Sequence, residues 1–439
     1  MKNKILILLA RLNFIFPNYL GYKYRKYGSF FKDNREKFDS LPLLLRTINY
    51  SKKSVPHYIK SNIKNIEGVK DFENNIPFID KDVVMDKWND FINVNLEGEK
   101  YDEGTTGGTS GKPLKLLMPK DRFIVEFNTV FSIWKQFGWN GHLRAVIRNK
   151  HLKENQTYTV DPITKQVIFD GFRTDSKYYE DIYQTIKKLK IKYIHAYPSS
   201  AYQFSLFLLK QNKDISFIKA FLCSSEGVTE LQKQLITKQL GIPICEFYGH
   251  SEKLIIGGPC KGNDAIHIEP TYGYFELVDE EGKVINTPGK LGEMVGTTLH
   301  NPLMPLIRYK TGDYAEFVGN YCPSCNRHLP LIKNIQGRWD KNKIYLKDGT
   351  YISTTALNLH SDLYQYIDGM QYIQYDKKHL EIHLVKGDNF NDNILERFND
   401  HFKKAFKGRC NFKIVFKTII EKEPNGKFLP LKQLTSENN

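Results

Sequence analysis

The middle of the chain alternates between amphipathic helical stretches and short apolar runs. The expected helices cover residues 178–190, 199–211 and 228–240, and the expected strands cover residues 192–197, 217–223 and 244–248. Thr229 and Gln232 have the spacing of a helix-capping box, and Gly241 follows the last of these helices as a stop signal. This alternation predicts a parallel sheet whose strands are joined by helical crossovers.

Polar residues follow these predicted strands where each strand ends. They occupy residues 197–200, 224–226 and 248–252. Ligands of parallel sheets bind beyond the carboxyl ends of the strands. The sequence therefore predicts a binding site at this edge, with Ser225 and Glu226 among its candidate residues.

The pattern changes near residue 272, where alternating polarity replaces helical spacing. Residues 272–279, 293–299 and 313–318 are expected to form strands of an antiparallel sheet or barrel. New hairpins and helices from residue 342 onward indicate a small α+β domain. We predict an α/β fold in three parts. These are a large N-terminal domain with a parallel sheet and an antiparallel barrel-like subdomain (1–337), a hinge (338–342) and a mobile C-terminal domain (343–439).

Residues 2–26 alternate between basic and apolar positions. A helix folded against the body of the protein is favoured, and an interfacial helix in contact with a membrane is the alternative. The apolar run at residues 5–10 is too short to span a bilayer, and no small-residue cleavage site follows it. We expect a cytoplasmic protein and leave peripheral membrane contact open.

The charge balance narrows the class of partner. The 64 Lys and Arg against 49 Asp and Glu give a formal net charge of +15, which favours anionic partners such as nucleotides, coenzyme A or an anionic membrane. Compositional drift without a partner is the alternative. The chain has no long basic run with interleaved aromatic residues, so we expect no specific nucleic-acid binding. Six cysteines are too few for a disulfide framework in 439 residues.

A short stretch at residues 105–113 is rich in glycine and hydroxyl groups and reads Thr-Thr-Gly-Gly-Thr-Ser-Gly-Lys-Pro. Glycine backbones can approach a ligand closely, and successive N–H groups can bind an anion. The Walker pattern is excluded, because Thr106 stands where it needs glycine and Pro113 where it needs Ser or Thr. The dinucleotide pattern fails at Thr106 as well. The stretch is either a phosphate-binding loop or a mobile surface loop.

This stretch resembles the phosphate loop of the adenylate-forming superfamily, whose pattern is Ser/Thr-x-Gly-Thr-Thr/Ser-Gly-x-Pro. Residues 106–113 match every signature position. The resemblance implies that this loop holds the phosphates of ATP through Thr106, Gly107, Gly108, Thr109, Ser110, Gly111 and Lys112. Short matches at residues 55–58 and 76–81 look like the phenylacetate–coenzyme A ligase-like branch, which includes members from surface-polysaccharide gene clusters.

A second motif at residues 248–252, Tyr-Gly-His-Ser-Glu, resembles the superfamily pattern Tyr-Gly-x-Thr/Ser-Glu. The resemblance implies that the aromatic ring stacks on adenine and that Glu252 binds magnesium, which prefers carboxylates and substrate phosphates. The nucleotide-binding residues expected here are Tyr248, Gly249 and Ser251. His250 occupies the variable position and is assigned no role. A solvated loop acid is the alternative for Glu252.

A third motif at residues 308–313, Arg-Tyr-Lys-Thr-Gly-Asp, resembles the pattern Arg-Tyr-x-Thr-Gly-Asp. The resemblance implies that Asp313 accepts hydrogen bonds from both ribose hydroxyls, a role that suits a carboxylate. A turn between two strands is the alternative.

Two C-terminal motifs complete the resemblance. Residues 337–340, Gly-Arg-Trp-Asp, resemble the hinge motif, which implies that Arg338 contacts the nucleotide. The turn before Lys427 resembles the motif whose lysine reaches the substrate carboxylate and the α-phosphate. The family usually has a basic residue a few positions later, whereas here Lys432 comes only after an apolar stretch. An exposed turn lysine is the alternative.

Cysteine spacing indicates a metal site. Cys322 and Cys325 are spaced so that their thiolates can chelate one ion, and Cys260 and His267 lie upstream. The phenylacetate–coenzyme A ligase-like branch has a similar set, which implies a closed structural zinc site. Free cysteines without a metal are the alternative.

The resemblance implies a two-step reaction in which Glu252 and Lys427 are the catalytic residues. A carboxylic acid attacks the α-phosphorus of ATP and pyrophosphate leaves; an acceptor then displaces AMP. The cofactors and co-substrates are ATP, magnesium, structural zinc and coenzyme A. An amine acceptor, giving an amide in surface-polysaccharide synthesis, is the alternative to coenzyme A. A non-enzymatic basic, zinc-stabilised binding protein is the second alternative. Which acid is used, and whether the protein is a monomer or homodimer, stays open.

Overall fold

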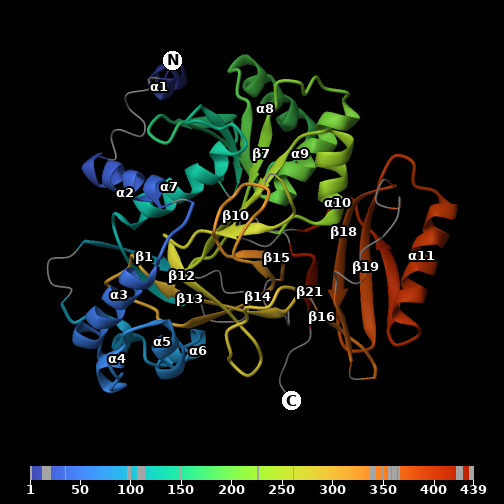
Figure 1. Cartoon of the computed structure of the whole chain (residues 1–439). Coiled ribbons are helices and arrows are strands. Elements are labelled where there is room, and N and C mark those ends of the chain that lie inside the picture. Colours follow the sequence, from blue (N-terminus) through green and yellow to red (C-terminus); the bar gives the residue numbers. More distant parts are fainter. Residues whose placement is uncertain are drawn as a thin grey trace. The chain divides into compact units, whose positions relative to one another are not determined.

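The computed structural model describes residues 2–11, 21–34, 36–95, 100–105, 114–148, 150–224, 227–260, 262–336, 343–348, 350–353, 357, 363, 366–421 and 429–434. Figure 1 shows the helices and strands of the chain, coloured along the sequence. The chain divides into two compact units. The first unit consists of Met1–Arg11, His142–Glu246 and Gly337–Asn439, and the second unit of Leu12–Gly141 and Phe247–Gln336. Within the described residues, no helix is both long and apolar enough to cross a membrane.

A six-stranded sheet lies at the centre of the first unit, in the order β4-β5-β3-β6-β7-β8. Its strands are β3 (Arg144–Arg148), β4 (Tyr158–Asp161), β5 (Gln166–Asp170), β6 (Tyr193–Ala196), β7 (Ala220–Cys223) and β8 (Ile244–Glu246). Neighbouring strands are parallel except β4 and β5, which are antiparallel. The predicted parallel sheet is confirmed, and β3, β4 and β5 extend it by strands that the sequence pattern did not predict.

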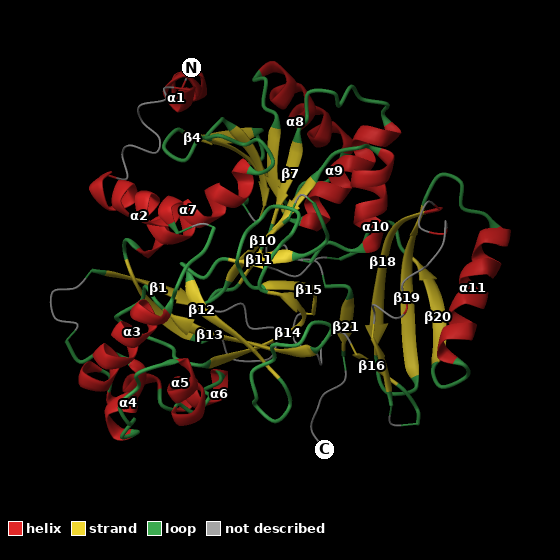
Figure 2. Cartoon of the chain, viewed as in Figure 1, coloured by secondary structure: helices red, strands yellow, loops and turns green. Residues whose placement is uncertain are grey.

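Helices α8 (Ser176–Lys188) and α9 (Pro198–Lys210) pack against this sheet (Figure 2). Alternate strand residues such as Ile147, Phe169 and Phe221 share one core with Ile182 and Phe204 of the helices. The third predicted helix begins as α10 (Glu230–Lys233) and continues as a π-helix at Gln234–Gln239. Both hydrogen bonds of its predicted capping box are present, since each of the two capping residues accepts from the other's backbone.

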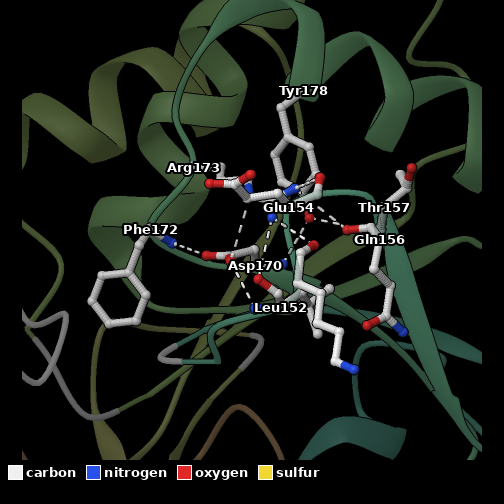
Figure 3. A network of polar contacts seen from close by, with 9 residues as sticks. Leu152, Glu154, Gln156, Thr157, Asp170, Phe172, Arg173 and Tyr178 are labelled. Carbon is white, nitrogen blue, oxygen red and sulfur yellow. Dashed lines mark hydrogen bonds and ion pairs between the residues drawn. The ribbon is translucent and has the colours of Figure 1, made fainter.

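The segment between β3 and β4 is fastened to the end of β5 by a polar network (Figure 3). The buried Asp170 carboxylate accepts from the backbone N–H groups of Leu152 and Phe172 at 2.8 and 2.9 Å. The Tyr178 hydroxyl accepts from the Asp170 N–H and donates to the Thr157 carbonyl, both at 2.8 Å. The Arg173 guanidinium donates to carbonyls of the same segment. These bonds give partners to backbone groups of the loop that are not paired by hydrogen bonds between strands.

The C-terminal part of the first unit has a four-stranded sheet of order β20-β19-β18-β21. The elements are the hairpin β16 (Lys343–Tyr345) and β17 (Tyr351–Ser353), strands β18 (Ile367–Gln374), β19 (His379–Lys386), β20 (Asn411–Phe416) and β21 (Leu431–Gln433), and helix α11 (Asp392–Phe406). Phe398, Phe402 and Phe406 recur at helical spacing on α11 and are buried. Lys407 then takes a left-handed conformation, φ 48°, which ends the helix.

The second unit is built on a seven-stranded antiparallel sheet of order β12-β13-β14-β15-β11-β10-β9. Its strands are β9 (Tyr248–Gly249), β10 (Ile256–Pro259), β11 (Ile266–Ile268), β12 (Gly273–Val278), β13 (Leu291–Thr298), β14 (Tyr309–Gly319) and β15 (Leu331–Gln336). A separate hairpin of β1 (Tyr101–Thr105) and β2 (Lys115–Pro119) flanks residues 106–113. The predicted change from a parallel to an antiparallel sheet is confirmed.

The helices of the second unit are α2 (Gly21–Asp33), α3 (Leu41–Ser54), α4 (Pro56–Lys60), α5 (Val69–Asn75), α6 (Lys81–Asp86), the 3-10 turn Trp88–Phe91, and α7 (Arg122–Lys135). Helix α7 lies close against β10, because a Cβ atom on Gly258 would come within 2.6 Å of the Ile133 side chain. Glycine at that position therefore permits the close approach of helix and strand.

The predicted fold class is confirmed: a parallel sheet with helices, an antiparallel sheet, and a small α+β C-terminal part. The division into residues 1–337, 338–342 and 343–439 stays a prediction, and the hinge at 338–342 lies outside the described residues. Helix α1 (Lys2–Arg11) folds against the first unit, as favoured from the sequence, because Ile7 and Ala10 are buried.

Candidate active site

The antiparallel sheet of the second unit brings the second and third motifs together. The Tyr248 hydroxyl in β9 donates to Oδ2 of Asp313 in β14 over 2.7 Å, although the two residues are 65 positions apart. Burial, and after it the neighbouring Asp313 carboxylate, raises the pKa of Tyr248, so the phenol stays protonated and donates. The two residues that the sequence assigns to adenine and ribose thus share a hydrogen bond.

The Glu252 carboxylate lies beside this pair and is held by two donors. Oε2 accepts from His250 Nδ1 at 3.0 Å, and Oε1 accepts from the Tyr309 hydroxyl at 3.3 Å. Burial raises the pKa of Glu252, but the hydrogen bond and charge of His250 and the bond from Tyr309 lower it to about 2. Glu252 is therefore an ionised carboxylate with a side chain only 8% exposed.

His250 is a functional candidate that the sequence analysis missed. Its Nε2 accepts from the Ile255 backbone N–H at 3.2 Å, while its Nδ1 faces Glu252. Since Nε2 accepts a backbone N–H, the ring donates to Glu252 through Nδ1. The ring connects the Ile255 backbone to the Glu252 carboxylate. We call Tyr248, His250, Glu252, Tyr309 and Asp313 the carboxylate cluster.

Arg308 fixes the backbone at the start of the third motif. It has a left-handed conformation, φ 53°, and its guanidinium donates to both carboxylate oxygens of Glu276 at 2.9 and 3.3 Å. It also donates to the carbonyls of Glu73 and Ile76 at 2.6 and 2.8 Å. These acceptors compensate the buried guanidinium for its lost hydration. The same bonds hold the backbone at Arg308 in place.

The short match at residues 76–81 lies directly against the third motif. The Ile79 N–H donates to the Arg308 carbonyl at 3.1 Å, and the Lys310 N–H donates to the Ile79 carbonyl at 2.8 Å. These bonds form a parallel bridge between Ile79 and Tyr309, the residue that donates to Glu252. Two stretches far apart in sequence therefore support one side of the carboxylate cluster.

Cys260, His267, Cys322 and Cys325 meet at another place in the same sheet; we call them the thiol cluster. Their ligand atoms all lie within 4.8 Å of one another. Cys260 Sγ is 3.7 Å from Cys322 Sγ, and Cys325 Sγ is 3.5 Å from His267 Nε2. His267 lies in β11 and Cys260 directly follows β10, its antiparallel neighbour.

These separations fit one tetrahedral zinc ion. With Zn–S near 2.3 Å and Zn–N near 2.0–2.1 Å, tetrahedral geometry places two sulfurs about 3.8 Å apart and a sulfur and a nitrogen about 3.6 Å apart. Burial raises the pKa of Cys322, but hydrogen bonds from Asn263 and the neighbouring thiols lower it to about 7. These hydrogen bonds favour the thiolate form of Cys322, the form that binds a metal ion.

The chain is similar in sequence and in fold to known proteins. The CapK C-terminal domain family matches residues 344–433. Protein CapK of Staphylococcus aureus is 23% identical over 405 residues, which cover 86% of this chain and 85% of that protein. The phenylacetate-coenzyme A ligase of Thermus thermophilus is 33% identical over 122 residues, 26% of either chain. The crystal structure of 2-hydroxyisobutyryl-CoA ligase in the postadenylation state superposes with a TM-score of 0.70 at 16% identity, covering 89% of this chain and 88% of that one.

These likenesses support the resemblance to the adenylate-forming superfamily that the sequence motifs indicate. The likeness to CapK along most of the chain and the local likeness to phenylacetate-coenzyme A ligase agree with the predicted resemblance to the phenylacetate–coenzyme A ligase-like branch.

The structure describes part of the site that the sequence motifs predict. Tyr248, Glu252 and Asp313 lie together in the carboxylate cluster, Gly249 pairs with Ile256 in β10, and Ser251 lies in the turn after β9. The remaining predicted site residues lie outside the described residues: Thr106, Gly107, Gly108, Thr109, Ser110, Gly111, Lys112, Ser225, Glu226, Arg338 and Lys427. Their roles stay predictions.

Proposed function

We propose that this protein activates a carboxylic acid with ATP. The acid's carboxylate attacks the α-phosphorus, an acyl-adenylate forms and pyrophosphate leaves; the thiol of coenzyme A then attacks the acyl carbon and AMP leaves. The observation that carries the proposal is the carboxylate cluster, in which an ionised, buried Glu252 lies beside the hydrogen-bonded pair of Tyr248 and Asp313.

Tyr248 and Asp313 would bind the nucleoside. The Tyr248 hydroxyl donates to Asp313, which fixes the orientation of the ring that would stack on a base. A carboxylate is acceptor-only, with about four lone-pair sites on its two oxygens, which suits two neighbouring hydroxyls such as those of ribose. The Tyr248 bond orients that carboxylate before any ligand arrives.

Glu252 would hold magnesium. Each of its oxygens accepts one described hydrogen bond, and a carboxylate oxygen can accept two, so both retain capacity for a cation. Magnesium on one carboxylate and on substrate phosphates would neutralise charge at the transferring phosphoryl group. His250 and Tyr309 would act as positioning residues that keep the carboxylate ionised and oriented.

The thiol cluster would hold a structural zinc ion. Three sulfurs and one nitrogen complete a tetrahedral shell and leave no open position for substrate, so the ion would stabilise the fold without entering the reaction. It would tie the loop after β10 to β11 and to the turn at Cys322–Cys325.

The remaining parts of the reaction rest on residues outside the described ranges. We propose that residues 106–112 hold the β- and γ-phosphates, that Ser225, Glu226 and Arg338 contact the nucleotide, and that Lys427 reaches the substrate carboxylate. Movement of the C-terminal part about residues 338–342 would bring Lys427 to the site.

The test is ATP–pyrophosphate exchange by the purified protein with a panel of aliphatic, aromatic and hydroxy acids, accompanied by calorimetric titration with AMP. We expect exchange with at least one acid and saturable AMP binding. Absence of exchange with every acid, together with absence of AMP binding, would overturn the proposal and favour a non-enzymatic binding protein.

The acceptor is tested separately, once an acid is found. Coenzyme A and a panel of amines, including amino sugars, are each added alone, and AMP release is followed. We expect coenzyme A to accelerate release and a thioester to appear by mass spectrometry. Acceleration by an amine alone, with an amide product, would replace the thiol step and leave the first step intact.

A further inference from the structure

Helix α1 is anchored to the first unit along one face. Ile7 belongs to the main core of that unit, and Ala10 is 1% exposed. The Asn3 side chain donates to the Tyr158 carbonyl at 3.2 Å, and the Arg11 guanidinium donates to the Leu189 carbonyl at 3.0 Å. Figure 2 shows α1 next to β4, the strand that contains Tyr158. The helix is therefore held near both ends.

The opposite face of α1 presents apolar side chains to solvent. Ile5, Leu8 and Leu9 are 54%, 63% and 37% exposed. They are spaced three and four residues apart, so they lie on one side of the helix. We call these residues the α1 stripe. Single exposed apolar residues are ordinary, whereas a contiguous group on an anchored helix indicates an interaction surface.

Basic residues border the α1 stripe. Lys4 is exposed within the same turn as Ile5. The Arg11 contact with the Leu189 carbonyl places the exposed Lys188 and Lys190 beside the C-terminal end of the helix. We call Lys4, Arg11, Lys188 and Lys190 the basic rim. It belongs to a chain with a formal net charge of +15.

We propose that the α1 stripe and the basic rim dock this protein on an anionic membrane surface. Apolar side chains flanked by lysine and arginine match the interfacial region of a bilayer, where acyl chains meet anionic headgroups. The helix is already folded and anchored, so binding does not require the ordering that a free amphipathic segment needs. The sequence left two alternatives for this segment, a helix folded against the protein and a helix at a membrane interface. In this proposal both hold, because one face of α1 packs against the protein and the other contacts the membrane.

A second copy of the chain is a poorer occupant. A stable protein–protein interface buries about 800 Å² on each partner. Three side chains on a ten-residue helix provide much less apolar area than that. Basic rims on two copies would also repel each other, whereas an anionic surface attracts them.

The experiment is flotation of the full-length protein with vesicles of two compositions. One is phosphatidylcholine alone, and the other contains about one-third phosphatidylglycerol, which supplies the negative surface potential. We expect flotation with the anionic vesicles at low ionic strength, and weaker flotation at high salt because exposed charges are screened. Equal binding to both compositions, or no binding to either, would overturn the proposal.

Variants assign the binding to this surface. The triple variant Ile5→Ser, Leu8→Ser, Leu9→Ser should lose flotation, whereas Leu291→Ser and Ile419→Ser, at residues 41% and 48% exposed elsewhere, should not. The pair Lys188→Gln and Lys190→Asn should weaken binding about 25-fold, at roughly fivefold per charge. Asparagine suits position 190, where φ is 52°. The matched control pair is Lys403→Gln and Lys404→Gln, two exposed lysines on α11.

Leu8→Trp keeps the proposal testable if the triple variant folds poorly. Tryptophan favours the membrane interface, so this variant should bind anionic vesicles more tightly than the natural chain. Unchanged or weaker binding would count against the stripe. Light scattering should show the same mass for natural and triple-variant protein; a dimer that only the natural chain forms would assign the stripe to a second copy. Because vesicle binding needs no acid, ATP or acceptor, its failure and failure of the proposed reaction are distinguishable.

Discussion

The carboxylate cluster and the thiol cluster lie in the same antiparallel sheet but are built in different ways. In the carboxylate cluster, each acid already accepts a hydrogen bond from a neighbouring side chain: Glu252 from His250 and Tyr309, and Asp313 from Tyr248. In the thiol cluster, four ligand atoms converge to within 4.8 Å of one another. Several of its contacts join one potential ligand to another rather than to a separate donor.

This difference agrees with the proposed roles, in which the carboxylate cluster binds substrate and the thiol cluster binds an ion. Preorganised donors keep Glu252 ionised and oriented in the absence of any ligand, so its loss should affect catalysis before stability. Thiolates and an imidazole crowded together repel or must stay protonated until a cation neutralises them, so loss of the ion should affect stability before catalysis. A change in the carboxylate cluster should therefore have little effect on stability, and a change in the thiol cluster should have little effect on catalysis.

Glu252→Gln should give the largest effect on activity. The amide keeps the size of the side chain but removes the negative charge that would bind magnesium. We expect ATP–pyrophosphate exchange to fall by a factor of about 100 to 1,000, the usual cost of removing an electrostatic stabiliser of charge. The unfolding temperature should change by only a few degrees. Steady-state exchange assays and a thermal melt measure the two quantities.

The matched control is Glu281→Gln, a turn carboxylate whose side chain is 72% exposed and which pairs with Lys283. It should leave exchange unchanged. If Glu252→Gln also retained full exchange, Glu252 would not be a magnesium ligand. If it unfolded the protein instead, the two clusters would not differ in the way described above.

Disruption of the thiol cluster should give the next largest effect, on stability. Removal of zinc by a chelator, or Cys322→Ser, should lower the unfolding temperature by roughly 10 °C, because binding of a structural ion contributes directly to folding. Exchange activity measured well below that temperature should persist. Elemental analysis of the purified protein should find one zinc per chain.

The control for this experiment is Cys410→Ala, which removes a buried thiol in the first unit. It should cost only packing and should remain sensitive to the chelator, whereas Cys322→Ser should show no further change when the chelator is added. A natural protein without bound metal and with no response to chelation would leave the cluster as free thiols.

The sequence predicted the fold best where hydrophobic period and turn chemistry agree. The helix that starts at Thr229 and the strand at β7 follow from helical spacing, a capping box and a short buried run. Strand β3 escaped prediction because Arg144 and Arg148 begin and end it, and charged ends do not look like a buried strand. The π-helical continuation at Gln234–Gln239 depends on packing around it and has no clear local signal.

The candidate site was predictable to the extent that its residues lie in contiguous motifs. The 248–252 and 308–313 motifs specify Glu252 and Asp313, but not that the Tyr248 hydroxyl bonds to Asp313. His250 escaped notice because it occupies a variable motif position, and its bond to the Ile255 backbone exists only in the folded turn. A histidine two residues before a predicted metal-binding glutamate is the signal that could have found it, since second-shell imidazoles often orient such ligands.

Asp313→Asn should give a moderate effect on nucleotide binding. An amide can still accept the Tyr248 hydroxyl through its oxygen, but its NH₂ group would face ribose hydroxyls that need an acceptor. We expect the KM for ATP to rise about 10- to 100-fold, with a smaller change in kcat, as expected when one charge-assisted hydrogen bond is lost and a donor is left unpaired. Calorimetric titration with AMP should show the same loss.

Asp400→Asn, at an exposed position on α11, is the matched control and should leave the KM unchanged. Tyr248→Phe removes the donor to Asp313 and should raise the KM as well. The double variant should then lose less than the product of the two single effects, because both changes act on one hydrogen bond. Strictly multiplicative effects would mean that the Tyr248 bond does not orient Asp313.

His250→Ala should give the smallest effect at neutral pH and a larger one at acidic pH. The pKa of Glu252 is about 2, below its usual 4.5, so the ionised carboxylate contributes to stability above pH 4.5 and this contribution is lost as the pH falls towards 2. Without His250, burial should raise that pKa, so Glu252 would begin to bind a proton at a higher pH. We expect the magnesium requirement of the variant to rise about tenfold at neutral pH. The ratio of the variant's magnesium requirement to that of the natural protein should increase further as the pH is lowered to about 5.

His250→Gln can still donate one hydrogen bond to Glu252 and should restore most of the magnesium affinity and the flat pH profile. His379→Ala removes an exposed imidazole that pairs with Asp376 and should match the natural protein at every pH. A magnesium requirement of His250→Ala that did not change with pH would show that the imidazole does not govern ionisation of Glu252. In that case the carboxylate cluster would depend on its backbone and on Tyr309, and its contrast with the thiol cluster would rest on preorganised geometry alone.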